Sequence, residues 1–93
     1  MTTLSDELSA CGWTVSEDGK AIGKTFRFAT FRDAMAWMVR AGFEAEAADH
    51  HPEWRNVYNR VEVTLTTHDT GGLTDKDTAL AAAFDRLAVA PKS

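Results

Sequence analysis

The amino-acid sequence predicts an α+β fold, in which helices pack on one face of a four-stranded antiparallel sheet. Two observations predict it. Apolar and polar residues alternate with a period of two in two pairs of segments, which is typical of half-buried strands. A helical apolar period separates these pairs and follows the second. The expected order is a short N-terminal helix and then a β-β-α-β-β-α core, in one domain spanning residues 1–93.

The first part of the chain predicts a short helix followed by a hairpin. Residues 3–11 form the helix, because Ser5 can cap its start and a Cys-Gly pair follows. Residues 13–15 form the first strand. Residues 17–20 contain Asp-Gly, which tolerates a positive φ and favours a turn. Alternation over residues 22–28 then predicts a second strand, antiparallel to the first.

The middle of the chain predicts the longest helix. Thr30 is a suitable N-cap, and Asp33 takes the position of its partner in a capping box. The helix ends by Asp49, because Pro52 disfavours helical backbone at the residue before it. The apolar residues with helical spacing, which we expect to face the core, are Phe31, Ala34, Met35, Met38, Val39, Gly42 and Phe43.

The last part repeats the strand pair and adds a helix. Residues 55–58 form the third strand, and residues 61–68 alternate as a fourth strand with His68 at the end of its polar face. A Gly-Gly pair then interrupts the chain. Thr74 and Asp77 predict the start of the last helix, and residues 91–93 are a tail. The core positions of that helix are Leu80, Ala83, Phe84 and Leu87.

Composition narrows the classes of protein. The net charge is −4, and the ten basic residues form no run, which argues against direct binding of nucleic acid or of an acidic membrane surface. No apolar run approaches the roughly 20 residues of a membrane span. The N-terminus lacks the pattern of a signal peptide, and a single cysteine cannot form an internal disulfide, so we expect a cytoplasmic protein. So small a domain often associates, which predicts a homo-oligomer, either dimer or tetramer.

All three histidines fall within residues 50–68, as His50, His51 and His68. Imidazole can both give and take a proton near neutral pH, so the cluster suggests acid–base chemistry. Three imidazoles are also a known zinc set, but the spacing of a metal motif is missing, so we expect no metal. From these residues alone, proton transfer, metal binding and coincidence remain open.

A longer pattern surrounds the histidines. It begins with Glu46, three spacer residues and His-His-Pro, and continues to an aromatic residue, a further histidine and an aspartate. This pattern strongly resembles the signature of the pterin-4a-carbinolamine dehydratases. The likeness extends from about residue 13 to residue 87, and the first dozen residues carry no match. The matching positions are Glu46, His50, His51, Pro52, Tyr58, His68 and Asp77.

The resemblance implies an activity and a site. Members dehydrate 4a-hydroxytetrahydropterin to quinonoid dihydropterin, which recycles a tetrahydrobiopterin-type cofactor, and they need no metal or organic cofactor. It implies that His50, His51 and His68 are catalytic, with His51 as the first candidate for proton donor. It implies that the following residues bind the pterin substrate: Glu46, Asp49, Trp54, Thr66, Thr67, Asp69 and Asp77.

Several of these residues have structural alternatives. Glu46 lies four residues before His50 and could orient its imidazole, because such positions share a helix face. Asp77 could equally be a capping carboxylate for the last helix. Trp54 could lie against the pterin or pack between strand and helix. Tyr58 is expected in the core or at an interface rather than in catalysis.

Two other functions compete with the dehydratase. Animal relatives of the family also act as dimerisation partners of a transcription factor, so the chain could be a non-catalytic regulatory scaffold. The retained His-His-Pro and His68 favour the enzyme, because a scaffold needs no such set. A metal-dependent hydrolase is disfavoured because no metal-binding motif is present.

Overall fold

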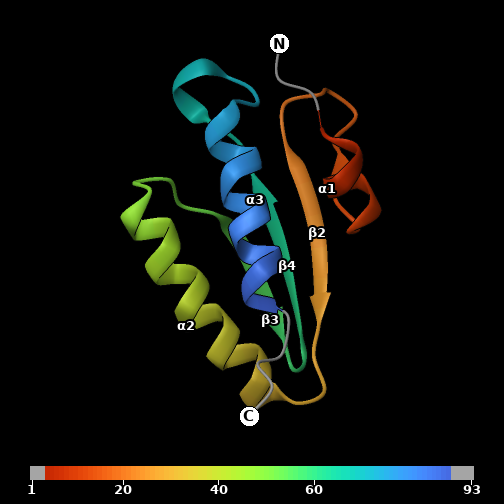
Figure 1. Cartoon of the computed structure of the whole chain (residues 1–93), viewed down its shortest axis with the longest axis vertical. Coiled ribbons are helices and arrows are strands. Elements are labelled where there is room, and N and C mark those ends of the chain that lie inside the picture. The colour runs from red at the N-terminus through yellow and green to blue at the C-terminus, as the bar shows by residue number, and fades with distance from the viewer. Residues whose placement is uncertain (1–3, 89–93) are drawn as a thin grey trace.

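The computed structural model describes residues 4–88, without the side chain of His68, and the expected tail at residues 91–93 lies outside it. The fold class is the predicted one, an α+β arrangement of one antiparallel sheet and helices (Figure 1). Its elements are α1 (Asp6–Ala10), β1 (Thr14–Val15), β2 (Ile22–Arg27), α2 (Phe31–Ala47), β3 (Glu53–Val57), β4 (Arg60–Leu65), the 3₁₀ turn η1 (His68–Thr70) and α3 (Asp75–Ala88).

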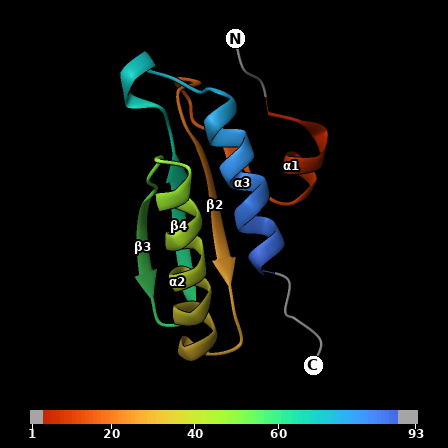
Figure 2. The same ribbon diagram turned by 60° about the vertical axis from the view of Figure 1, so that its left-hand side comes forward.

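The sheet has the strand order β1-β2-β4-β3, and every neighbouring pair is antiparallel. The central pair aligns Ile22 with Leu65 and Arg27 with Arg60. Helices α2 and α3 lie side by side over one face of the sheet, α3 nearer β2 and α2 nearer β3 (Figures 1 and 2). The C-terminal end of α2 therefore lies on the same side of the sheet as the start of α3, and this arrangement positions the candidate site.

The core lies between the sheet and the two long helices. The inward residues of β4, Val61, Val63 and Leu65, are almost completely buried, as alternation predicts. Aromatic rings fill the space above them, with the ring centroids of Trp37 and Phe84 5.5 Å apart in an edge-to-face contact. The Trp37 Nε1–H donates to the Phe84 carbonyl at 3.1 Å, so its polar atom is satisfied inside the core.

The predicted helix starts are confirmed by their capping bonds. The side chain of Ser5 accepts from the Leu8 backbone N–H at 3.2 Å. The side chain of Thr30 accepts from the Asp33 N–H at 3.1 Å. Each bond satisfies a backbone donor that the first helical turn leaves free. Among residues 4–88, no helix is long and apolar enough to cross a membrane.

The predicted core face of α2 is largely wrong. The residues that α2 buries are Ala34, Trp37, Ala41 and Ala45. Four of the predicted core residues lie instead on an outer face, with exposed fractions of 45% for Phe31, 41% for Met35, 53% for Val39 and 71% for Phe43. The helix carries two neighbouring apolar stripes, and the one made of a tryptophan and small alanines faces inward because it fits close to the sheet and to α3.

The ends of strands β3 and β4 also differ from the prediction. Strand β3 starts at Glu53 and ends at Val57, and Tyr58 adopts a left-handed turn conformation with φ of 51°. Tyr58 is 65% exposed, so it does not lie in the core, and the other expected position, at an interface, stays a prediction. Strand β4 ends at Leu65, and His68 begins the turn η1 rather than ending the strand. The chain leaves the sheet there because Thr67 pairs with Gly72 across a tight loop.

Candidate active site

The end of α2 turns His50 into the protein. Asp49 has a φ of 50°, in the left-handed region, immediately after the last helical turn. The Asp49 N–H donates to the Glu46 carbonyl at 3.1 Å, and the His50 N–H donates to the Ala45 carbonyl at 3.0 Å. These two bonds form a Schellman motif, which ends a helix and reverses the chain direction. His50 is consequently only 8% exposed.

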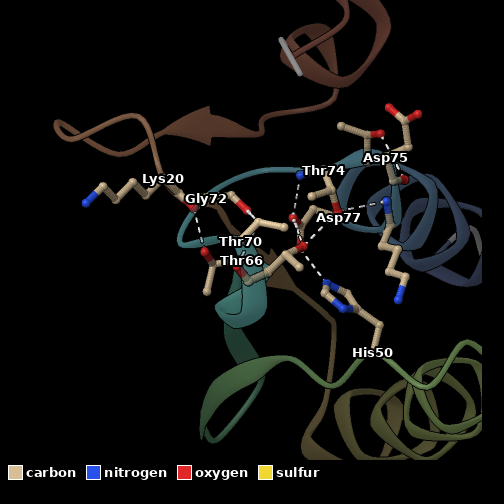
Figure 3. Close-up of polar contacts among 11 residues, drawn as sticks. Lys20, His50, Thr66, Thr70, Gly72, Thr74, Asp75 and Asp77 are labelled. Atoms are coloured by element: carbon tan, nitrogen blue, oxygen red, sulfur yellow. Dashed lines mark hydrogen bonds and ion pairs between the residues drawn. The ribbon is translucent and has the colours of Figure 1, made fainter. Parts of the chain in front are cut away.

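The imidazole of His50 meets a buried carboxylate from the start of α3. His50 Nε2 lies 2.5 Å from Asp77 Oδ1, and Asp77 is fully buried (Figure 3). The other carboxylate oxygen accepts from the Thr67 hydroxyl at 2.7 Å and from the Thr74 backbone N–H at 3.0 Å. Asp77 is therefore the capping carboxylate of α3 and, at the same time, the partner of His50.

This network determines which ring nitrogen of His50 carries the hydrogen. An ionised carboxylate only accepts hydrogen bonds, and Asp77 is surrounded by donors. His50 Nε2 must then carry a hydrogen and donate it to Asp77. The hydrogen bond of one ring nitrogen decides the state of the other, so neutral His50 has its free lone pair on Nδ1.

A second imidazole–carboxylate pair lies at the surface. His51 Nε2 is 2.8 Å from Glu46 Oε1, and the two side chains are 60% and 78% exposed. The expectation that Glu46 would orient His50 is therefore wrong. The helix ends at Ala47, so the i, i+4 geometry does not continue to residue 50, and the left-handed Asp49 sends His50 and His51 in different directions.

A polar pocket of about 240 Å³ lies beside the histidines of both pairs. Both histidines line it, together with residues of the loop that follows β4. Thr66 in that loop is fixed because its hydroxyl donates to the Lys20 carbonyl at 2.5 Å (Figure 3). A larger hollow of about 560 Å³ between α1 and α3 contains no histidine, so volume alone does not locate the chemistry. The residues lining the polar pocket are Asp49, His50, His51, Thr66, Thr67, Asp69 and Lys76.

The pocket brings together most of the candidates and adds one. Lys76 was not among the predicted site residues, although its position directly before Asp77 in the first turn of α3 was a usable signal. Trp54 does not line the pocket and stacks on Phe84, with ring centroids 6.3 Å apart. This is the alternative in which Trp54 packs between strand and helix. The side chain of His68 lies outside the part of the chain that the structure describes. Within the described part, no three His, Cys, Asp or Glu side chains are arranged to hold a metal ion.

The fold and the pocket define a class: a small α+β protein whose histidines, paired with carboxylates, can exchange protons with a bound molecule. Comparison with known families identifies it further. The family model described as Pterin 4 alpha carbinolamine dehydratase matches residues 1–87, so the likeness begins earlier than the sequence pattern indicated. The chain belongs to this family, which supports a dehydratase, or hydro-lyase, activity.

Individual relatives agree with the family match. A protein of Rhizobium meliloti (strain 1021), provisionally named pterin-4-alpha-carbinolamine dehydratase, is 56% identical over 77 residues, which cover 83% of this chain and 74% of the relative. One from Opitutus terrae with the same provisional name is 57% identical over 77 residues, covering 82% and 77%. A crystal structure from Brucella melitensis, described as a transcriptional coactivator/pterin dehydratase, has a TM-score of 0.83 at 38% identity and covers 94% of this chain and 99% of that one.

A more distant structure shares the fold alone. It is described as a pterin dehydratase-like protein that is a RuBisCO assembly factor in the alpha-carboxysome. Its TM-score is 0.74 at 21% identity, with coverage of 86% of this chain and 93% of that one.

Proposed function

We propose that this protein removes water from 4a-hydroxytetrahydropterin to give quinonoid dihydropterin, by general acid–base catalysis in the polar pocket. The observation that carries the proposal is the presence of two imidazole–carboxylate pairs at one pocket, His50 with Asp77 and His51 with Glu46. The reaction requires both a proton donor and a proton acceptor, and two imidazoles in different environments can divide these tasks.

The two pairs suit different roles. His51 is exposed and can exchange protons with water, so we assign it as the acid that protonates the 4a-hydroxyl, which leaves as water. His50 is held by Asp77 through Nε2, so Nδ1 is the nitrogen that accepts the proton from N5 of the pterin. The electron pair of the N5–H bond then forms the double bond between N5 and C4a, and the protons balance over the step.

The other candidates are assigned to binding. Asp49, Thr66, Thr67 and Asp69 line the pocket with donors and acceptors suited to the amide edge of a pterin ring. By family resemblance, His68 supplies a third imidazole. The physiological role that we infer is recycling of a tetrahydrobiopterin-type cofactor, in the cytoplasm.

Comparison of two variants tests the assignment. We expect His51→Ala to lower the rate of dehydration of 4a-hydroxytetrahydropterin by about a hundredfold, the usual contribution of a general acid. Arg55→Ala is the matched control, because Arg55 is also exposed but lies on β3 outside the pocket. A His51→Ala rate equal to that of the control would overturn the role of His51.

The alternative function is a non-catalytic scaffold that acts by association. The Brucella structure is described by both roles, and the exposed apolar residues of α2 are the observation in this chain that favours association. Association does not exclude catalysis, and we also propose that the protein is a homo-oligomer. A scaffold without catalysis predicts a dehydration rate unchanged by His51→Ala.

A further inference from the structure

A second hollow adjoins the polar pocket. It is a groove of about 280 Å³ between the C-terminal end of α2 and the first half of α3, the two helices that lie side by side over the sheet (Figures 1 and 2). We call it the helix groove. Lys76 lines both the helix groove and the polar pocket, so the two hollows adjoin at this residue. The other residues that line the groove are Glu44, Ala48, Ala79, Leu80 and Ala83.

The helix groove differs from the polar pocket in its chemistry. Four of its six lining residues are alanine or leucine, whereas the polar pocket is lined only by histidine, threonine, aspartate and lysine. Apolar surface gains free energy when an apolar group covers it. A molecule with a polar ring and an apolar substituent would therefore find a suitable surface for each part, one on either side of Lys76.

The side chain of Lys76 can accommodate such a molecule. It is exposed, and among residues 4–88 its ammonium group makes no ion pair and no hydrogen bond. A lysine without a partner breaks no contact when it changes rotamer, and its three N–H donors remain free for a ligand. Lys76 therefore does not have to lose an interaction when a ligand passes from the pocket into the groove.

The proposed chemistry orients a pterin toward the groove. In that proposal N5 lies at His50, and the amide edge of the ring lies at the loop that follows β4. Within a pterin, C6 is bonded to N5 and lies at the opposite end of the ring system from the amide edge. Ala48, a wall of the groove, is two residues before His50. A substituent on C6 consequently leaves the pocket beside His50, on the side of Ala48.

We propose that the helix groove binds the C6 substituent of the pterin. The protein then favours 4a-hydroxytetrahydropterins whose C6 substituent is apolar over those that carry a hydroxyl group on each carbon of the substituent. Hydroxyl groups placed against alanine and leucine side chains lose their hydrogen bonds to water without gaining partners. This inference rests on the proposed function, because that function orients the ring.

Isothermal titration calorimetry without oxygen tests the preference, with tetrahydropterins that differ only at C6. These compounds keep N5–H but lack the 4a-hydroxyl, so they bind without reacting. We expect 6-pentyltetrahydropterin to bind about tenfold more tightly than 6-methyltetrahydropterin, a factor that burial of about two methylene groups supplies. The 6-(1,2,3-trihydroxypropyl) compound should bind no more tightly than the 6-methyl compound. Equal affinities for the pentyl and methyl compounds would overturn the proposal.

Substitutions in the groove test the location of the pentyl group. Ala48→Leu fills the groove, so it should lower the affinity for the pentyl compound to that for the methyl compound and leave the latter unchanged. Ala47→Leu is the matched control, because Ala47 is also exposed at the end of α2 but does not line the groove. Ala79→Leu narrows the groove from α3 and should act as Ala48→Leu does. An undiminished preference for the pentyl compound in both groove variants would contradict the proposal.

The same titrations separate this inference from the proposed function. If the three tetrahydropterins bind with one affinity, the groove has no role, and the polar pocket remains a pterin site. If none of them binds to the wild-type protein, the polar pocket is not a pterin site, and both proposals are rejected.

Discussion

The buried carboxylate of Asp77 offers the sharpest perturbation of the site, by Asp77→Asn. The amide oxygen of the new side chain should stay toward the Thr74 N–H, which is a fixed donor. The amide nitrogen then faces His50 Nε2 and donates to it. His50 must change tautomer, so that Nε2 becomes the acceptor and Nδ1 carries the hydrogen.

The magnitudes follow from the hydrogen bonds. Three bonds to a charged group become bonds involving a neutral amide, each weaker by about 1 kcal/mol, and partial readjustment leaves a loss of about 2 kcal/mol in the free energy of unfolding. Asp77→Asn also removes a negative charge from the first turn of α3, where a carboxylate is stabilising. Asp75 lies exposed in the same turn, so Asp75→Asn loses this contribution too. The difference between the two variants isolates the buried network.

Three measurements test this prediction. Urea denaturation followed by circular dichroism gives the loss of stability, which should be clearly larger for Asp77→Asn than for Asp75→Asn. Nitrogen chemical shifts of the histidine rings give the tautomer, and His50 should show hydrogen at Nε2 in the wild type and at Nδ1 in Asp77→Asn. The dehydration rate should fall by about tenfold or more, because the proposed base has lost its lone pair at Nδ1. An unchanged tautomer would show that Asp77 does not determine which ring nitrogen of His50 carries the hydrogen.

Two further outcomes are expected. Lys76→Ala should raise the KM for the pterin about fivefold with little change in kcat, as measured by steady-state kinetics, because Lys76 lines the pocket without touching either imidazole–carboxylate pair. Asp85→Ala should lower the free energy of unfolding by about 2 kcal/mol in urea titrations, since it removes the partner of Trp13 Nε1, at 2.9 Å, and of Lys24 Nζ, at 2.7 Å.

Local signals in the sequence predicted most of the fold. Alternation located the strands, and the caps at Ser5 and Thr30 located two helix starts, because these features depend on neighbouring residues only. The inward face of α2 was predicted wrongly for a physical reason. Period alone does not distinguish two adjacent apolar stripes, and the buried one consists mostly of alanines such as Ala34 and Ala41, whose hydrophobic signal is weak.

Most of the residues that line the polar pocket were named from the sequence, but the pairings of the histidines with carboxylates were not. His50, His51 and Asp77 were named, but the contact of His50 with Asp77 joins residues 27 positions apart and depends on how α2 and α3 pack. Glu46 contacts His51 rather than His50 because the backbone of Asp49 is left-handed. A non-glycine residue seldom adopts this conformation. Contacts set by one such residue cannot be derived from spacing.

The rate of water loss from 4a-hydroxytetrahydropterin in the presence of the wild-type protein is the direct test of the proposed activity. In a stopped-flow experiment that follows formation of quinonoid dihydropterin by absorbance, we expect a rate that rises in proportion to protein concentration, well above the rate in buffer. A rate equal to the buffer rate at every protein concentration would contradict it.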